Sequence, residues 1–117
     1  MKVIISLGSN SNQEENIQRA REILSHLIPD ASFTEPVWTD PVAEADRPAG
    51  DNKYLNCLVE GHTNMTEPRL LARLKQIEIT MGDNHENHVK GQVSIDLDLI
   101  RYGEHKLRKL IWSDMDV

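Results

Sequence analysis

The sequence has a single cysteine, no long apolar run and no excess of positive charge. Cys57 alone cannot form a disulfide within the chain. The run Val3-Ile4-Ile5 is too short for the apolar region of a signal peptide or for a membrane span. A net charge of -6 argues against general nucleic-acid binding, which needs a basic surface. These absences favour a cytoplasmic protein that binds neither nucleic acid nor membrane.

What is present is the composition of a globular protein. The chain has 117 residues, of which 38% are hydrophobic and 27% are charged. This length suits one domain of ordinary size with a buried core. We therefore expect residues 1–117 to form a single domain.

The hydrophobic pattern predicts two helices among four strands. Ser11 and Glu14 form a capping-box pattern that marks the first helix, and Thr66 is the expected N-cap of the second. The expected strands cover residues 2–7, 32–38 (with Pro36 indicating an edge), 53–62 and 94–100. The order strand, helix, strand, strand, helix, strand predicts the α+β, ferredoxin-like βαββαβ fold. In this fold two helices cover one face of an antiparallel four-stranded sheet.

Polar and apolar residues alternate strictly from Ser94 to Leu99. The alternation predicts a strand with one buried face, and it places Asp96 and Asp98 together on the other face, roughly 7 Å apart. Paired carboxylates suit Mg²⁺, which usually takes one or two protein carboxylates together with substrate phosphates. A solvated strand face with two charges explains the same short pattern, so the pattern alone leaves both interpretations open.

The strand expected at residues 53–62 carries a second candidate group. Tyr54 and Asn56 share the face opposite to Leu55 and Cys57. A ring and a side-chain amide on one face can stack on a planar heterocycle and hydrogen-bond to its edge. A partly buried tyrosine beside a strand-edge asparagine is the simpler alternative. In the expected fold, however, both pairs of residues face the surface that the helices leave open.

Short segments across almost the whole chain match one family in order and nearly in spacing. They are Leu7-Gly8-Ser9-Asn10, Asp40-Pro41, Tyr54-Leu55-Asn56, Ile77-Glu78, Gly82, Gly91, Asp96-Leu97-Asp98-Leu99 and Tyr102-Gly103. With these segments the chain resembles the 6-hydroxymethyl-7,8-dihydropterin pyrophosphokinase family of folate synthesis. The resemblance implies transfer of a diphosphate from ATP to the hydroxymethyl group of the pterin.

The resemblance also implies roles for particular residues. Asp96 and Asp98 would be the catalytic residues that bind two Mg²⁺ ions, which grip the ATP phosphates. The residues implied for pterin binding are Tyr54, Asn56, Asp40, Pro41 and Val42. The residues implied for the nucleotide side are Glu78, Lys90 and Arg101.

The chain departs from the family pattern at two arginine positions, which Asp83 and Val93 occupy here. The family also continues beyond the point that corresponds to Val117, so the chain resembles a short member. Neither aspartate nor valine can clamp phosphate as a guanidinium does, and turnover is therefore expected to be slow. Two alternatives follow: a non-catalytic relative that binds pterin or nucleotide, and a ferredoxin-like module that self-associates as a homo-oligomer.

Overall fold

The computed structural model describes residues 1–40, 53–82, 91–115 and 117. Pro41, Val42 and Lys90 lie outside these described residues. The elements in chain order are β1 (Lys2–Ser9), α1 (Gln13–Leu27), β2 (Ser32–Phe33), β3 (Val37–Thr39), β4 (Tyr54–His62), α2 (Glu67–Thr80), β5 (Asp96–Tyr102) and β6 (His105–Lys106).

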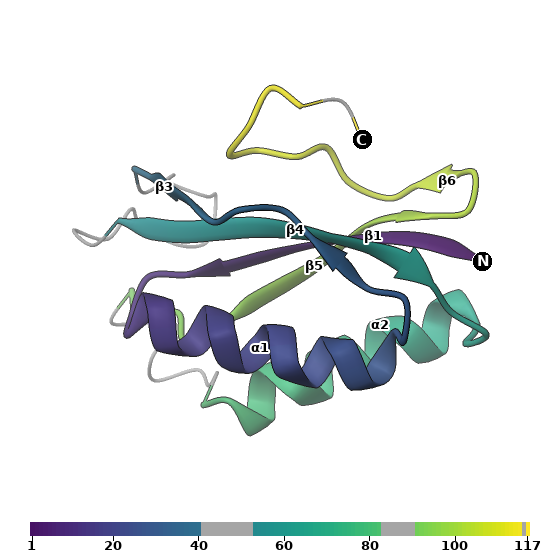
Figure 1. The fold of residues 1–117 in the computed structure, drawn as a ribbon, viewed down its shortest axis with the longest axis horizontal. Helices are drawn as coiled ribbons and strands as arrows, with labels where there is room; N and C mark the ends of the chain where they lie inside the picture. Colours follow the sequence, from purple (N-terminus) through teal and green to yellow (C-terminus); the bar gives the residue numbers. More distant parts are fainter. Residues whose placement is uncertain (41–52, 83–90, 116) are drawn as a thin grey trace.

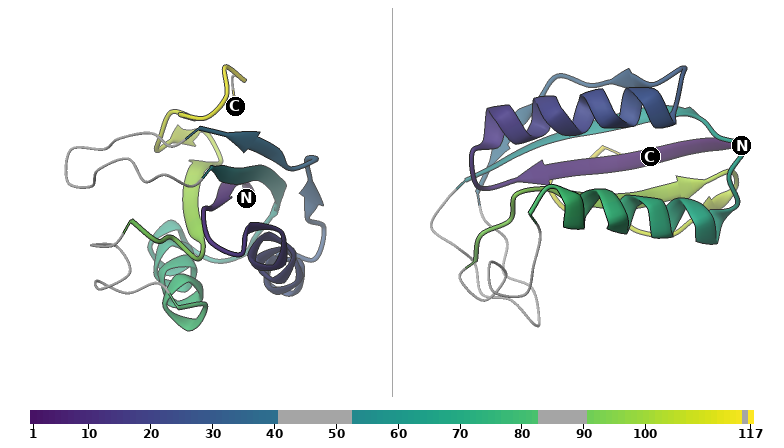
Figure 2. Two further views of the ribbon diagram at one scale, coloured as in Figure 1. Left: turned by 90° about the vertical axis from the view of Figure 1, so that its left-hand side faces the viewer. Right: turned by 90° about the horizontal axis from the view of Figure 1, so that it is seen from below.

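The strands form one antiparallel sheet in the order β2-β4-β1-β5-β6, and β3 also pairs with β4. Figure 1 shows both helices on one side of this sheet, and the right-hand view of Figure 2 shows them side by side against it. The chain after β6 passes over the opposite side of the sheet (Figure 1). This arrangement confirms the α+β, ferredoxin-like fold.

The sheet has six strands where four were expected. The expected strand at residues 32–38 is split into β2 and β3, which both pair with β4. The break includes Pro36, which has no N–H to donate to a strand ladder. A proline is tolerated here because the strand lies at an edge, as expected from Pro36 in the sequence. Thr34 bridges the break, since its N–H donates to Leu58 O and its Oγ1 accepts from Leu58 N, each at 2.9 Å. The short β6 supplies the remaining strand by pairing with Arg101 and Tyr102.

The turn after β1 differs from the expected capping box. The N-cap of α1 is Asn12, which has a left-handed φ of 45° and makes no side-chain capping bond. Ser11 contributes its backbone carbonyl instead, which accepts from Asn16 Nδ2 at 2.7 Å. β1 itself runs on through Gly8 and Ser9, two residues further than the pattern predicted, because both pair with β4.

The helix-covered face holds the main core. Every second residue of the long strands points there, including Ile5, Leu7 and Leu97, and meets the apolar stripes of the two helices. The second helix begins as expected, with Thr66 Oγ1 accepting from Arg69 N at 3.4 Å. Its end is also as expected, because Gly82 adopts the left-handed φ of 97° that terminates helices.

A second, smaller cluster lies on the opposite face. It joins Ile4, Leu58 and Ile100 of the sheet to Leu110, with Trp112 packed against them. Trp112 Nε1 also donates to Ser6 Oγ at 2.7 Å. The C-terminal segment is thereby fixed across part of the open face, a contact that the sequence pattern did not predict.

Candidate active site

The open face presents short polar side chains in rows across three strands. Gly8 of β1 lies between Asn56 of β4 and Asp96 of β5, and Ser6 lies between Leu58 and Asp98. Neighbouring strands are about 4.8 Å apart. The amide of Asn56 on β4 and the carboxylate of Asp96 on β5, which stand in one row with β1 between them, are therefore separated by roughly 10 Å. A ligand that spans this face would therefore contact an amide at one end and carboxylates at the other.

A pocket lies directly over these rows. It has a volume of about 640 Å³, counting the space at its open mouth. Its floor is the sheet, and one wall is the C-terminal segment, which contributes Arg108 through Trp112. Tyr54, Asn56, Asp96 and Asp98, four of the residues that the sequence singled out, line this one pocket.

One end of the pocket has the geometry of a ring-binding site. Asn56 is almost fully buried, and its Nδ2 donates to Thr39 Oγ1 at 2.6 Å. A Cβ placed on Gly8 would lie 2.9 Å from Asn56 Oδ1 and 3.6 Å from Tyr54 Cδ2. The amide and the ring therefore lie across the space that a side chain at position 8 would fill. A half-buried ring beside an oriented amide suits a planar heterocycle with polar edges.

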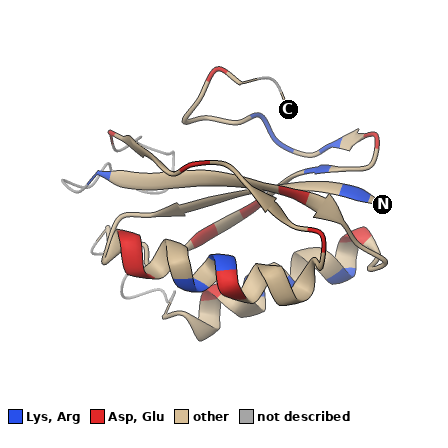
Figure 3. Cartoon of the chain, viewed as in Figure 1, with Lys and Arg blue, Asp and Glu red and all other residues tan. Residues whose placement is uncertain are grey.

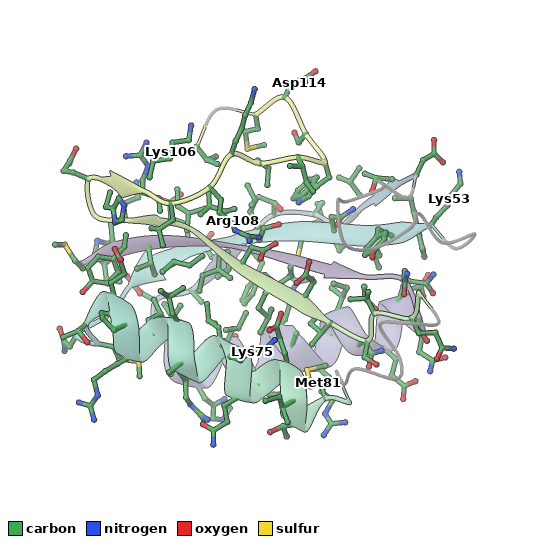
Figure 4. All side chains as sticks on the ribbon, turned by 180° about the vertical axis from the view of Figure 1, so that it is seen from behind. Lys53, Lys75, Met81, Lys106, Arg108 and Asp114 are labelled. Carbon is green, nitrogen blue, oxygen red and sulfur yellow. The ribbon has the colours of Figure 1, made fainter. Side chains whose placement is uncertain are left out.

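The other end of the pocket carries negative charge. Asp96 and Asp98 lie on the same face of β5, as the alternation predicted. Arg108 Nη1 lies 2.7 Å from Asp98 Oδ1, so a cationic group already occupies one side of this pair. Figure 4 shows the Arg108 side chain between the C-terminal segment and the sheet, and Figure 3 shows acidic positions on β5 in red and the basic stretch of that segment in blue.

These residues fit a divalent cation that is completed by substrate oxygens. In the described part of the chain, no group of three or more His, Cys, Asp or Glu side chains forms a metal cluster. Two carboxylates on one strand face match the preference of Mg²⁺ for a few protein oxygens together with phosphates and water. The guanidinium of Arg108, which pairs with Asp98, shows that a positive charge is favoured at this position on the face.

Glu78 is not among the described residues that line this pocket, but its side chain shares a hydrogen bond with Asp96, which does line it. Glu78 projects from α2 with only 7% of its surface exposed, and its Oε2 accepts from Leu97 N at 2.8 Å. Burial raises the pKa of Glu78 to about 8; the hydrogen bond from Leu97 opposes the rise, and the nearby Asp96 carboxylate adds to it. Its position four residues after Leu74, on the apolar stripe of the helix, is the sequence signal for a buried carboxylate.

The remaining predicted residues lie at the rim or outside the pocket. Asp40 is exposed at the rim, 3.8 Å from the Nζ of Lys53. Arg101 is half-buried on β5 and is not among the described residues that line the pocket. The sequence analysis missed Arg108 and Trp112, since their segment has no periodicity and its only local signals are basic charge and one aromatic residue.

Fold and site together define a small α+β protein with a pocket on the sheet face opposite the helices, lined by a tyrosine and an amide at one end and by two carboxylates at the other. More particularly, the chain belongs to the 7,8-dihydro-6-hydroxymethylpterin-pyrophosphokinase (HPPK) family, whose model matches residues 4–115. Members of this family use ATP as co-substrate, typically with Mg²⁺.

Two plant proteins are similar to most of the chain. A folate synthesis bifunctional protein of Arabidopsis thaliana is 32% identical over 108 residues, which are 91% of this chain. A mitochondrial folate synthesis bifunctional protein of Pisum sativum is 35% identical over 112 residues, or 92% of this chain. The chain spans only 22% and 20% of the length of these relatives.

The described helices are all unsuited to crossing a membrane, because none is both long enough and apolar enough. The expected cytoplasmic location stays a prediction, since one of the two plant relatives is named as mitochondrial.

Proposed function

We propose that this chain transfers a diphosphate from ATP to 6-hydroxymethyl-7,8-dihydropterin, as an HPPK of folate synthesis. The observation that supports this most is the row Asn56–Gly8–Asp96, which puts an amide and a carboxylate on one open face. We propose that the amide binds the ring and that the carboxylate binds the metal. Their separation of roughly 10 Å leaves room for the hydroxymethyl group and a phosphate chain between them. Membership of the family supports the same assignment.

The pterin would lie at the end of the pocket formed by β3 and β4. Tyr54 would stack on its ring, and Asn56 would hydrogen-bond to its polar edge from an amide already oriented by Thr39. Asp40 lies at the same rim. Pro41 and Val42, also proposed for pterin binding, follow it in the sequence but lie outside the described residues.

Asp96 and Asp98 would hold two Mg²⁺ ions at the other end. The ions would neutralise the ATP phosphates and align them for in-line displacement. The hydroxymethyl oxygen forms a bond to the β-phosphorus while the bond from that phosphorus to the oxygen that bridges it to the α-phosphorus breaks. AMP leaves with the electron pair, and the hydroxyl proton passes to water. By holding both substrates in one orientation, the face makes the attack effectively intramolecular.

Among the described residues, Arg108 is a guanidinium that lines the pocket beside Asp98, at the end proposed for the phosphates. When Asp98 binds a metal ion, Arg108 loses its present partner and becomes available to donate to a phosphate oxygen. Lys90 and Arg101 remain proposed for the nucleotide side. No arginine stands at positions 83 and 93, so we expect catalysis to be slow.

One observation favours a second candidate, a non-catalytic relative that binds the same ligands. Val93 is buried, and its backbone is bonded to Asn10 at both ends: its N–H donates to Asn10 Oδ1 at 2.6 Å and its carbonyl accepts from Asn10 N at 3.0 Å. The position that carries an arginine in the family pattern is thus built into the fold as an apolar residue. Binding without turnover would follow if no other cation replaces it.

Calorimetric titration of the pterin, with and without Mg²⁺ and a non-hydrolysable ATP analogue, tests the proposal together with an AMP-release assay. We expect binding that strengthens with the nucleotide analogue, and slow AMP release from ATP. Asn56→Ala should abolish pterin binding, whereas Asn64→Ala, an exposed asparagine outside the pocket, should not. Binding without AMP release would establish the second candidate, and failure of the wild-type chain to bind would overturn both.

A further inference from the structure

We propose that Glu78 is a positioning residue that, from α2, holds the strand of the two aspartates in place. This inference rests on the proposed function, because Asp96 and Asp98 are metal ligands only there. Glu78 would act through the backbone of Leu97 and through its side-chain hydrogen bond with Asp96, and would itself bind neither metal nor nucleotide. This differs from the nucleotide-side role that the family resemblance implies for it.

The contact lies between the two aspartates. Glu78 Oε2 accepts from the N–H of Leu97, the residue that separates Asp96 from Asp98, at a distance of 2.8 Å. The side chain of Leu97 points into the main core, so this residue is held by its side chain and by its backbone at once. A shift of Leu97 along or across the strand would move both carboxylates, because neighbouring residues of a strand share one backbone.

The outer edge of β5 depends on this contact. Among the described residues, β5 pairs with β1 on one side and with β6 only at Arg101 and Tyr102 on the other. Since the N–H of Leu97 points to a helix side chain, it faces the side away from β1. Here α2 takes the place of a neighbouring strand, and Glu78 supplies the hydrogen-bond acceptor that the missing strand would have supplied.

The surroundings of Glu78 suit a fixed structural contact. The residue is 7% exposed and lies on the buried stripe of α2. Lys75 Nζ, one turn earlier on the same helix, lies 3.8 Å from the other carboxylate oxygen, Glu78 Oε1 (Lys75 is labelled in Figure 4). The Glu78 side chain also shares a hydrogen bond with the carboxylate of Asp96. With these partners the Glu78 carboxyl group has a defined orientation toward the strand.

The effect should fall on metal affinity. Mg²⁺ demands near-ideal octahedral geometry, and groups that orient metal ligands typically change metal affinity by about 10- to 100-fold when removed. The ring end of the pocket stands on β4, which β1 separates from β5 in the sheet. We therefore expect a loss of metal affinity without a loss of pterin affinity.

Three substitutions separate the acceptor oxygen from the ionisable group and from its reach. Glu78→Gln keeps an acceptor oxygen in place without a group that can ionise, whereas Glu78→Leu has similar bulk and no acceptor. Glu78→Asp keeps the carboxyl group but is too short to reach Leu97. Leu70→Val is the matched control. Leu70 lies on the same buried face of α2, and its apolar side chain cannot accept a hydrogen bond from β5, so this variant loosens the packing alone.

The experiment is a titration of each folded variant with Mn²⁺ in the presence of a non-hydrolysable ATP analogue, with pterin affinity measured in parallel. We expect Glu78→Gln to stay within about twofold of wild type, and Glu78→Leu and Glu78→Asp to bind Mn²⁺ about 10- to 100-fold more weakly. Leu70→Val should bind as wild type does. Should Glu78→Leu fail to fold, the Mn²⁺ affinities of Glu78→Gln and Glu78→Asp decide whether the acceptor oxygen matters.

Two results would overturn the inference alone: wild-type Mn²⁺ affinity in Glu78→Asp, or a loss in Glu78→Gln as large as in Glu78→Asp. The latter would show that the carboxyl group itself is needed, and that an acceptor oxygen alone is not enough. Failure of the proposed function is distinguishable, because Asp96→Asn would then bind Mn²⁺ as tightly as wild type. In that case the inference falls together with the function on which it rests.

Discussion

At the pocket, the two faces of the sheet carry different kinds of side chain although the same strands build both. Toward the helices, β1 presents Ile5 and Leu7, which are fully buried. Toward the pocket, the same strand presents Ser6 and Gly8. The helix-covered face stabilises the fold through apolar contact, and the open face, beside the smaller cluster at Leu110, leaves room for a ligand. Substitutions on one face should therefore change stability, and substitutions on the other should change binding.

The largest effect is expected on the open face, from Asp98→Asn. The variant should lose metal-dependent ATP binding and on the order of 10³-fold in rate, because a preorganised charge at the reacting phosphates is removed. Its melting temperature should change little, since the partly exposed pair with Arg108 contributes only about 0–1 kcal/mol.

Calorimetry with ATP and thermal unfolding measure these two quantities for Asp98→Asn. Glu104→Gln is the control, because it removes an exposed carboxylate at the β5–β6 turn, outside the pocket. Unchanged metal-dependent ATP affinity in Asp98→Asn would contradict the metal assignment.

Leu24→Ala probes the opposite face. Leu24 of α1 is fully buried in the main core, and its truncation should lower the free energy of unfolding by about 2–5 kcal/mol. The ligand affinity of the molecules that remain folded should match wild type. Denaturant unfolding and pterin titration at low temperature measure the two effects. A variant that is folded by circular dichroism but has lost pterin affinity would show that the two faces are not separable.

Gly8→Ala tests whether the two ends of the pocket are separable from each other. The new Cβ would lie 2.9 Å from Asn56 Oδ1 and would displace the amide and the Tyr54 ring. Overpacking of this kind costs about 1–3 kcal/mol, so pterin affinity should fall about 10-fold or more while Mn²⁺ affinity stays unchanged. Equal losses of both affinities would mean that position 8 shapes the whole face.

The smallest effect is expected far from the pocket, at Asp30. Its carboxylate accepts from His62 N at 2.8 Å and pairs with His62 Nδ1 at 2.7 Å, and these contacts, the backbone one foremost, lower its pKa below 3.8. A lowered pKa in the folded state stabilises the protein above pH 3.8 and ceases to do so as the pH falls through the folded value.

Thermal unfolding of wild type and Asp30→Asn at neutral and strongly acidic pH checks this. Wild type should be slightly more stable at neutral pH, and the difference should shrink once the pH lies well below 3.8. A difference that is constant or grows toward acid would contradict the assigned ion pair.

The strand faces could be predicted from the sequence because side-chain direction in a strand follows a period of two. Leu55 and Cys57 belong to the main core, and Tyr54 and Asn56 line the pocket, as the alternation indicated. The element order was enough for the fold class, because strand–helix connections of this length leave few topologies. The ligands of these side chains stay predictions.

Contacts between distant segments could not be predicted. Leu110 and Trp112 follow no period, and their burial depends on Ile4, Leu58 and the Ser6 hydroxyl, which lie far away in the sequence. The ion pair of Arg108 has the same origin. At the first helix, Ser11 was the expected N-cap, but Asn12 takes this position with a left-handed backbone. The strand before it ends later than its pattern indicated, so the chain turns into the helix one residue further on.

The central place of β1 has a consequence for how the protein is made. β1 pairs with β4 and with β5, which both follow it in the sequence, so its two neighbours are synthesised after it. Until Tyr102 has been added, β1 has at most one of them, and its apolar residues lack part of their cover. Pairings between such distant segments slow folding, because long loops must close first. Recovery of ligand binding during refolding should therefore coincide with the final closure of the sheet.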